Sequence, residues 1–227
     1  MNDLTAPVHP AKAIHSPFHF NSAAYLVRIE RERAANIGEL LLAVRKCSED
    51  SIFQHTFRTL QEHHFIDEGY SNDFALWTHL GRYAEGLAKD LASVDIRSFT
   101  SIEDLRARIV QVVEEYLRRE PASRDRPAGK PFCFCSSETV LMPTSFVARN
   151  LQEFTQAMRQ VSVHSIHYHF IEARLRLRLK TNDFSRWLKE MGLAREAMRV
   201  NELDIYTSAL DDVRGDIVAI LEAAAVK

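Results

Sequence analysis

The chain repeats itself, and this repetition limits the folds that it can adopt. When residues 17–55 are laid over residues 131–169, 13 of the 39 aligned positions are identical, whereas unrelated segments would share roughly two or three. The identical pairs are Pro17/Pro131, Phe18/Phe132, Phe20/Phe134, Ser22/Ser136, Ala34/Ala148, Asn36/Asn150, Glu39/Glu153, Ala43/Ala157, Arg45/Arg159, Ser48/Ser162, Ser51/Ser165, Ile52/Ile166 and His55/His169.

The match continues beyond this block with small changes of offset. The segment Asn72-Asp73-Phe74-Ala75-Leu76-Trp77 meets Asn182-Asp183-Phe184-Ser185-Arg186-Trp187, and the apolar stripe of the last helix also recurs. Two copies are too few for a solenoid, so we expect two similar subdomains that pack against each other. The predicted organisation is a disordered tail (1–16), repeat 1 (17–116), a charged Pro- and Gly-containing linker (117–130) and repeat 2 (131–227).

Helices dominate the expected secondary structure, because glycine and proline number only seven each in 227 residues and both residues interrupt helices. The predicted fold class is all-α, a tandem duplication of a roughly four-helix unit. Short extended Phe-x-Phe segments at 18–20 and 132–134 accompany the helices, and the pattern leaves open whether they pair. The expected N-caps are Asn36, Ser51 and Asn72 in repeat 1 and Asn150, Ser165 and Asn182 in repeat 2.

Composition and charge exclude several classes of function. The formal net charge is 29 − 31 = −2, without the basic excess of proteins that grip nucleic acid by charge, so nucleic acid is not an expected partner. The longest purely apolar runs are five residues, too short for a membrane span. We see no signal peptide and no disulfide pattern among Cys47, Cys133 and Cys135, and we interpret Cys133 and Cys135 as small buried hydrophobic residues. The expected location is the cytoplasm.

The first candidate site is a histidine with an Asn-Asp dipeptide, present once in each copy as His55 with Asn72-Asp73 and as His169 with Asn182-Asp183. Each histidine lies three residues after an isoleucine, on the apolar edge of a helix. A carboxylate that returns to a buried imidazole can orient it for base catalysis or metal binding. The structural interpretation is that Asn caps a helix, Asp complements its dipole and the histidine is a satisfied core group.

The second candidate is a basic run that contains Arg176 and Arg178 and has no counterpart in the first copy. It predicts either an ion-paired or solvated helix face, or anchoring of a sugar-phosphate-type ligand. His63 and His64 are additional potential metal ligands. No histidine spacing typical of a metal site occurs, however, so we predict no metal and no cofactor. Nucleophile elbows, phosphate loops and kinase motifs are absent from the sequence.

The motifs Pro-Phe-Cys-Phe-Cys at 131–135, Ala148-Arg149-Asn150-Leu151, Ser165-Ile166-x-x-His169-Phe170 and Asn182-Asp183-Phe184-Ser185-x-Trp187 together resemble a bacterial helical family that is catalogued only as a domain of unknown function. The second copy matches best, and the first departs with His19 and Asn21 where the second has Cys133 and Cys135. The resemblance implies no established activity. Family members that lie near carbohydrate-handling genes suggest a regulatory module for sugar-active enzymes.

The sequence therefore favours a cytoplasmic, non-catalytic helical module that binds a protein partner or itself, or that regulates another protein. The alternative is a ligand- or metal-binding enzyme whose His/Asp site forms at the interface between the two repeats. A cleft with both histidines facing it would favour the enzyme, and two histidines sealed in separate cores would favour the interaction module.

Overall fold

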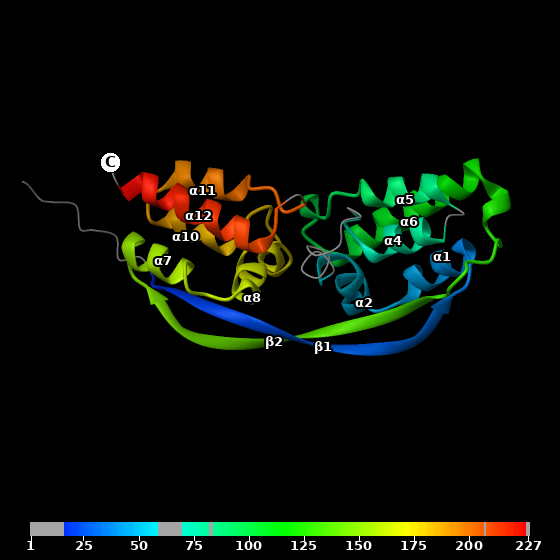
Figure 1. Cartoon of the computed structure of the whole chain (residues 1–227), viewed down its shortest axis with the longest axis horizontal. Helices are drawn as coiled ribbons and strands as arrows, with labels where there is room; N and C mark the ends of the chain where they lie inside the picture. Colours follow the sequence, from blue (N-terminus) through cyan, green and yellow to red (C-terminus); the bar gives the residue numbers. More distant parts are fainter. Residues whose placement is uncertain (1–15, 59–69, 82–83, 207, 226–227) are drawn as a thin grey trace, which may run out of the picture.

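The computed structural model describes residues 16–58, 70–81, 84–206 and 208–225. Two helical lobes sit side by side on one long β-ribbon (Figure 1). The ribbon consists of two antiparallel strands of 17 residues each, β1 (Phe18–Ala34) and β2 (Phe132–Ala148). The protein is therefore a mixed α/β chain, and the all-α prediction is wrong. The Phe-x-Phe segments do pair, as the first residues of strands that are far longer than the short extended pieces expected.

Burial along the strands explains why the sequence concealed them. Only the beginning of each strand alternates cleanly, with Phe18 and Phe20 buried in β1, and at the far end Ala34 alone is buried. The middle of β1 is half-buried or exposed and carries the mixed charged segment 28–33, so it has no period-2 apolar pattern. The middle of such a strand has no local sequence pattern that predicts it, because it is stabilised by pairing with the neighbouring strand.

The register of the ribbon is nearly symmetric. Phe18 pairs with Ala148 at one end, and Ala34 pairs with Phe132 at the other. Tyr25 pairs with Thr139 at the centre, and these two residues also occupy equivalent positions when the two halves are aligned. A local two-fold axis therefore passes through the middle of the ribbon. Register shifts occur between His19 and Asn21 and between Ile29 and Arg33, where bulges add twist.

The two lobes contain their helices in the same order. Lobe 1 consists of α1 (Ile37–Lys46), α2 (Glu49–Phe53), the π-helix η1 (Gln54–Arg58), α4 (Asp73–Leu80), α5 (Glu85–Ala92), η3 (Ile96–Ser98), α6 (Ile102–Arg119) and η4 (Pro121–Ser123). Lobe 2 consists of α7 (Leu151–Met158), α8 (Val163–Ile166), the π-helix η5 (His167–Glu172), α9 (Ala173–Leu177), α10 (Asp183–Glu190), α11 (Ala194–Asn201) and α12 (Leu210–Ala225). The expected linker begins as helix, since α6 extends to Arg119, and residues 1–15 of the expected tail lie outside the described residues.

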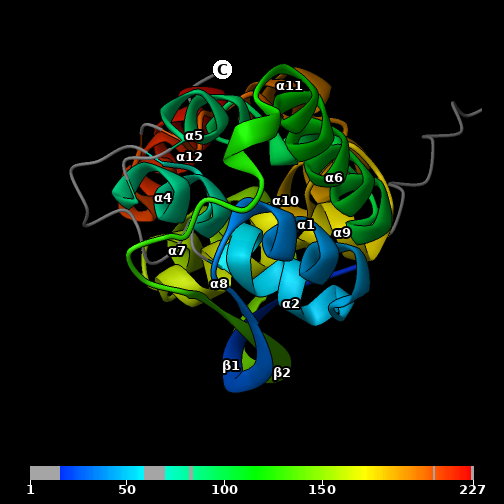
Figure 2. The same cartoon turned by 90° about the vertical axis from the view of Figure 1, so that its right-hand side faces the viewer.

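Each strand begins in one lobe and ends in the other. Phe18 and Phe20 of β1 pack on Phe154 and Phe184 of lobe 2, and β1 then crosses to lobe 1, where α1 follows. The strand β2 makes the reverse journey from lobe 1 to lobe 2 (Figure 1). Each lobe is thus completed by the Phe-x-Phe segment that belongs, in sequence, to the helices of the other lobe. Viewed from the end, the ribbon projects beneath the helical layer (Figure 2).

Polar caps set the helix starts at nearly equivalent residues. Asn36 accepts a hydrogen bond from the Glu39 amide at 2.8 Å, while the Glu39 carboxylate accepts one from the Ala35 amide at 2.7 Å, which forms a capping box. Asn150 and Glu153 repeat this in lobe 2. The predicted caps Ser51 and Ser165 are wrong by three residues: Ser48 and Ser162 are the caps, and Ser51 and Ser165 supply the amides that the caps accept.

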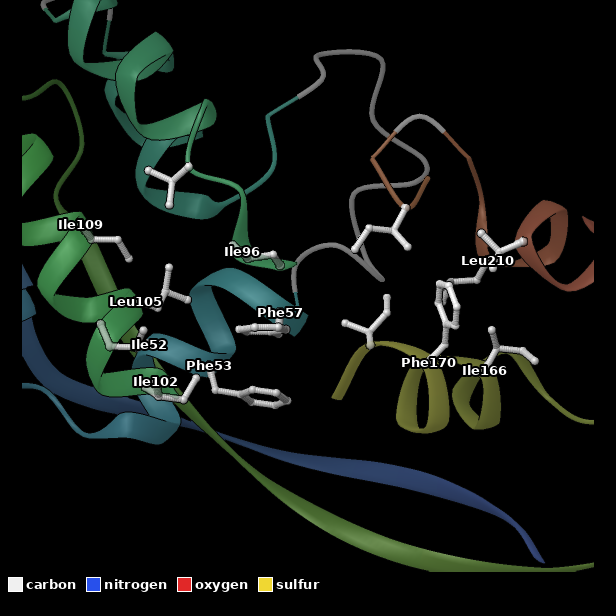
Figure 3. Packing of buried hydrophobic residues seen from close by; sticks show 14 of the residues in the cluster. Ile52, Phe53, Phe57, Ile96, Ile102, Leu105, Ile109, Ile166, Phe170 and Leu210 are labelled. Carbon is white, nitrogen blue, oxygen red and sulfur yellow. The ribbon is translucent and has the colours of Figure 1, made fainter. Parts of the chain in front are cut away.

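The lobes also contact each other above the ribbon. The Arg97 guanidinium of lobe 1 donates to the carbonyls of Asn201 at 2.6 Å and Leu203 at 2.8 Å in lobe 2. The buried apolar residues form one continuous cluster across both lobes, and Figure 3 shows Phe57 and Phe170 at this junction. None of the helices described is long and apolar enough to cross a membrane.

Candidate functional site

The first matched pair lies in the core of lobe 1. His55, on the π-helix η1, contacts the Asp73 carboxylate through Nδ1 at 2.7 Å. Its second nitrogen, Nε2, accepts a hydrogen bond from the backbone amide of Cys135 on β2 at 2.9 Å. The ring packs against Phe132 and Phe134 of the same strand. His55 therefore joins the start of α4 to the strand that enters from the other half of the sequence.

The second pair repeats this arrangement in lobe 2. His169, on the π-helix η5, contacts Asp183 through Nδ1 at 2.7 Å and accepts from the Asn21 amide of β1 at 2.8 Å. Asn21 is the position equivalent to Cys135 in the aligned halves. The same three-part chain of carboxylate, imidazole and strand amide thus occurs once in each lobe.

These contacts determine the state of both imidazoles. A backbone amide can only donate, so Nε2 is the unprotonated nitrogen, and Nδ1 carries the proton that it shares with the carboxylate. His55 and His169 are 4% and 3% exposed, and both of their nitrogens are occupied. They are sealed in separate lobes, so the His/Asp site expected at the interface between the repeats is not formed.

Asn72 and Asn182 act as buried caps that also bind a neighbouring helix. Asn72 accepts from the Ala75 amide at 2.9 Å and donates to the Leu91 carbonyl of α5 at 3.0 Å. Asn182 accepts from the Ser185 amide at 2.8 Å and donates to the Asn201 side chain of α11 at 3.2 Å. Both amides are therefore consumed in holding consecutive helices together.

One arginine of the basic run in lobe 2 is ion-paired. Arg176 donates to Asp183 at 2.5 Å and stacks over the Tyr168 ring at 4.5 Å. Burial alone would raise the pKa of Asp183, but hydrogen bonds from His169 and Arg176 hold that pKa below its ordinary value. Arg178 is exposed and adopts a left-handed conformation (φ 52°) at the end of α9. Arg176 is therefore held against Asp183, while Arg178 lies exposed at the end of the helix.

The two tryptophans secure the strand entrances, a role that sequence reasoning missed. The Trp187 indole stacks on Phe154 and donates to the Ser16 carbonyl at 3.0 Å. The Trp77 indole donates to the Lys130 carbonyl at 2.8 Å. Each accepting carbonyl lies two residues before the first phenylalanine of an entering strand.

A buried polar cluster between the lobes was also missed. The Tyr25 hydroxyl, at the centre of the ribbon, donates to Glu172 and lies 2.9 Å from His167 Nδ1. His167 reaches lobe 1 through Nε2, 3.0 Å from the Phe57 carbonyl. The Arg58 guanidinium stacks on the Tyr25 ring at 3.9 Å. Burial and the Glu172 charge both raise the pKa of the Tyr25 hydroxyl, so it stays protonated and donates.

The signal that could have revealed this cluster is the difference between the two halves. When they are aligned, Tyr25 meets Thr139, His167 meets Phe53, and Arg58 meets Glu172. Matched polar residues fasten each lobe separately, whereas unmatched ones gather at the junction.

A cleft of about 400 Å³ opens beside this cluster. Its walls are α2 and the start of α6 on one side, the middle of β2 beneath, and η5 with α9 on the other side. Volumes of this size accommodate small ligands. The lining residues are Glu49, Asp50, Phe53, Ile102, Ser137, Glu138, Thr139, Leu141, Tyr168, Glu172, Leu175 and Arg176.

Metal ligands do not cluster in the part of the chain that the structure describes, where no group of three or more His, Cys, Asp or Glu side chains could hold an ion. His63 and His64 lie outside the described residues. The expectation that Cys133 and Cys135 are buried is wrong: Cys133 is exposed and Cys135 is half-buried. The two cysteines alternate along β2 with Phe132 and Phe134, and it is these phenylalanines that point into the core.

Comparison with known proteins gives a family but no activity. The structure is similar to one titled "The structure of OrfY from Thermoproteus tenax", with 31% sequence identity and a TM-score of 0.81 over 93% of this chain and 97% of that one. A comparison with curated proteins finds no match. The model of a family of unknown function, DUF5752, matches residues 15–222. The chain therefore belongs to this family.

Proposed function

We propose that the protein is a non-catalytic interaction module that associates with a second copy of itself through the outer face of its β-ribbon. The observation that carries this proposal is a set of large aliphatic side chains exposed there: Leu26 is 55% exposed, Val140 39% and Met142 50%. These residues alternate with Tyr25 and Ser137, which face the lobes, so they point away from the helices.

A second copy is the occupant that this face suits best. Leu26 and Val140 are equivalent positions on either side of the local two-fold axis, so the centre of the patch is symmetric, while Met142 corresponds to Arg28. Arg28 and Glu138 flank it with opposite charges and are 73% and 61% exposed. In an isologous contact each unlike pair forms twice, so Arg28 of one copy can meet Glu138 of the other.

The physical gain comes from covering a sheet that has only two strands. Such a ribbon is marginal when one face is open to water, and a second twisted ribbon can pack on it as in a β-sandwich. Three large aliphatic side chains form a small contact compared with a stable interface of about 1,200 Å² or more. We therefore expect a dimer that dissociates on dilution.

The contacts of the matched histidines support the proposal that the protein is not a catalyst. Both nitrogens of His55 and of His169 are taken by hydrogen bonds inside the fold. We also propose that the two halves are two copies of one ancestral unit, since equivalent residues make equivalent bonds in both lobes. A reducing cytoplasmic location belongs to the proposal because the three cysteines are free.

Sedimentation velocity over a wide concentration range tests the proposal. The unmodified protein should shift from monomer to dimer as its concentration rises, and the double substitution Leu26→Lys with Val140→Lys should keep it monomeric. The matched control is Leu80→Lys, which changes an equally exposed leucine (63%) at the end of α4. A monomer at all concentrations, or equal dimerisation of the double variant, would refute self-association through the ribbon.

A further inference from the structure

We propose that the cleft between the lobes is a binding site for an organic diamine or polyamine, a ligand with ammonium groups separated by short aliphatic chains. The cleft is formed by residues from both lobes and by the inner face of β2. This inference is independent of the outer ribbon face, because ligand binding in the cleft does not require a second copy.

The charges of the lining select a cation. Glu49 and Asp50 at the start of α2 and Glu172 on η5 supply three carboxylates, while Glu138, on the outer face of β2 beside Arg28, only borders the cleft. Among the described lining residues Arg176 is the one cation, and its guanidinium is already paired with Asp183, while Arg58 lies behind the wall on the Tyr25 ring. An anionic ligand such as a sugar phosphate would meet this surplus of negative charge, so the cleft disfavours it.

The carboxylates are not all equally available. Glu138 is partly neutralised by Arg28 at 3.1 Å, and Glu172 accepts a hydrogen bond from Tyr25. Glu49 and Asp50 are exposed at the rim. The cleft therefore has a buried carboxylate at its inner wall and two free ones at its mouth. That distribution suits a ligand with two separated ammonium groups.

The apolar part of the lining suits the chain between two charges. The lining also contains the apolar side chains of Phe53, Ile102, Leu141 and Leu175. Methylene groups gain roughly 0.8 kcal/mol each when they are fully buried against such surfaces. A divalent metal ion would not use these side chains.

Ser137 is an independent indication of a ligand. It lines the cleft and is 3% exposed. Its hydroxyl oxygen has no hydrogen-bond partner among the described residues, although an unsatisfied buried hydroxyl is costly. The equivalent position in the other strand is Ala23, so the ribbon does not need a hydroxyl there for its own stability. The oxygen itself is buried, so an ammonium group in the cleft would supply the missing partner once the side chain rotates toward it.

Isothermal titration of the full-length protein with putrescine (butane-1,4-diamine) tests the site. Butane-1,4-diol serves as a neutral analogue with the same carbon chain. We expect saturable binding of the diamine and none of the diol. Asp50→Asn should weaken binding about tenfold, because it removes one charge-assisted contact. The matched control Asp216→Asn, an exposed position on α12, should leave the affinity unchanged.

Two further variants locate the site within the cleft. Ser137→Ala should weaken binding by a smaller factor than Asp50→Asn, and Leu141→Trp, which fills the cleft from a half-exposed position, should abolish it. Far-UV circular dichroism and melting temperature show whether these variants fold. Equal binding by all folded variants, equal binding of the diol, or no binding by the unmodified protein would each overturn the proposal. The Leu26→Lys/Val140→Lys double variant should still bind, which separates this test from that of self-association.

Discussion

At the scale of single residues, the structure uses its histidines as two-sided connectors. His55 joins Asp73 to the Cys135 amide, and His169 joins Asp183 to the Asn21 amide. A neutral imidazole suits this position because it has one donor and one acceptor on opposite sides of a flat ring. Its planar faces also pack against the phenylalanines around it.

We predict that His55→Ala and His169→Ala each lower the free energy of unfolding by about 2–4 kcal/mol, because each removes buried packing, one hydrogen bond to a carboxylate and the acceptor of a strand amide. Urea denaturation measures the change. His19→Ala, at an exposed position of the same ribbon, should change it by less than about 0.5 kcal/mol. Variants as stable as the parent would show that these bonds do not hold the strands, and stabilisation by added zinc would favour a metal role.

At the scale of secondary structure elements, the ends of the ribbon are secured and its middle is supported less. At each end a Phe-x-Phe pair inserts into a lobe, and one strand amide donates a hydrogen bond to a histidine. Just before the strand starts, a backbone carbonyl accepts a hydrogen bond from an indole. The π-helices η1 and η5 carry these histidines. A π-helical turn contains one more residue than an α-helical turn, and several buried polar residues lie on these two turns. Figure 1 shows how the strands then span from one lobe to the other.

The tryptophans should differ in their contribution. Trp187 is 4% exposed and stacks on Phe154 at 4.7 Å between ring centroids, whereas Trp77 is half-buried. We predict that Trp187→Ala costs about 3–5 kcal/mol of unfolding free energy and that Trp77→Ala costs less, because it removes less buried surface. Thermal and chemical denaturation of both single variants check the order. An equal or reversed order would mean that the indole hydrogen bonds matter more than ring packing.

At the scale of the whole molecule, the crossed strands make each lobe dependent on both halves of the sequence. The core of lobe 2 contains Phe18 and Phe20, which are more than 100 residues away from Phe154 in the chain. Arg97 and the Tyr25 cluster then join the lobes above the ribbon. Such long-range contacts are made late and slowly in folding, so the two lobes are expected to unfold together.

We predict that the isolated second half, residues 131–227, forms a homodimer. Two copies of β2 can pair with Thr139 on a true two-fold axis, so that each strand enters the lobe of the other copy and the Cys135 amide meets His169 there. Size-exclusion chromatography with light scattering measures the mass, and Phe134→Ala serves as a control that should weaken the dimer. A folded monomer would show that the strand can return to its own lobe.

Much of the local structure follows from the sequence. Asn36, Asn72 and their matched counterparts cap helices as predicted, and the pairing of His55 with Asp73 is present. The correspondence of the two halves also pointed to matched positions without any structure. The caps at Ser51 and Ser165 were misplaced because a serine at the third helical position resembles one at the cap when neighbouring serines stand three residues apart.

The ribbon and the junction between the lobes were decided only by the tertiary structure. A cap, a helix period or a matched dipeptide depends on residues within a few positions of one another, so the sequence alone determines them. The partner of a strand, and the lobe that it enters, depend on residues at least 98 positions away (Ala34 pairs with Phe132), and no local pattern encodes that choice. The unmatched groups Tyr25, Arg58 and Glu172 became neighbours only because the two strands cross there.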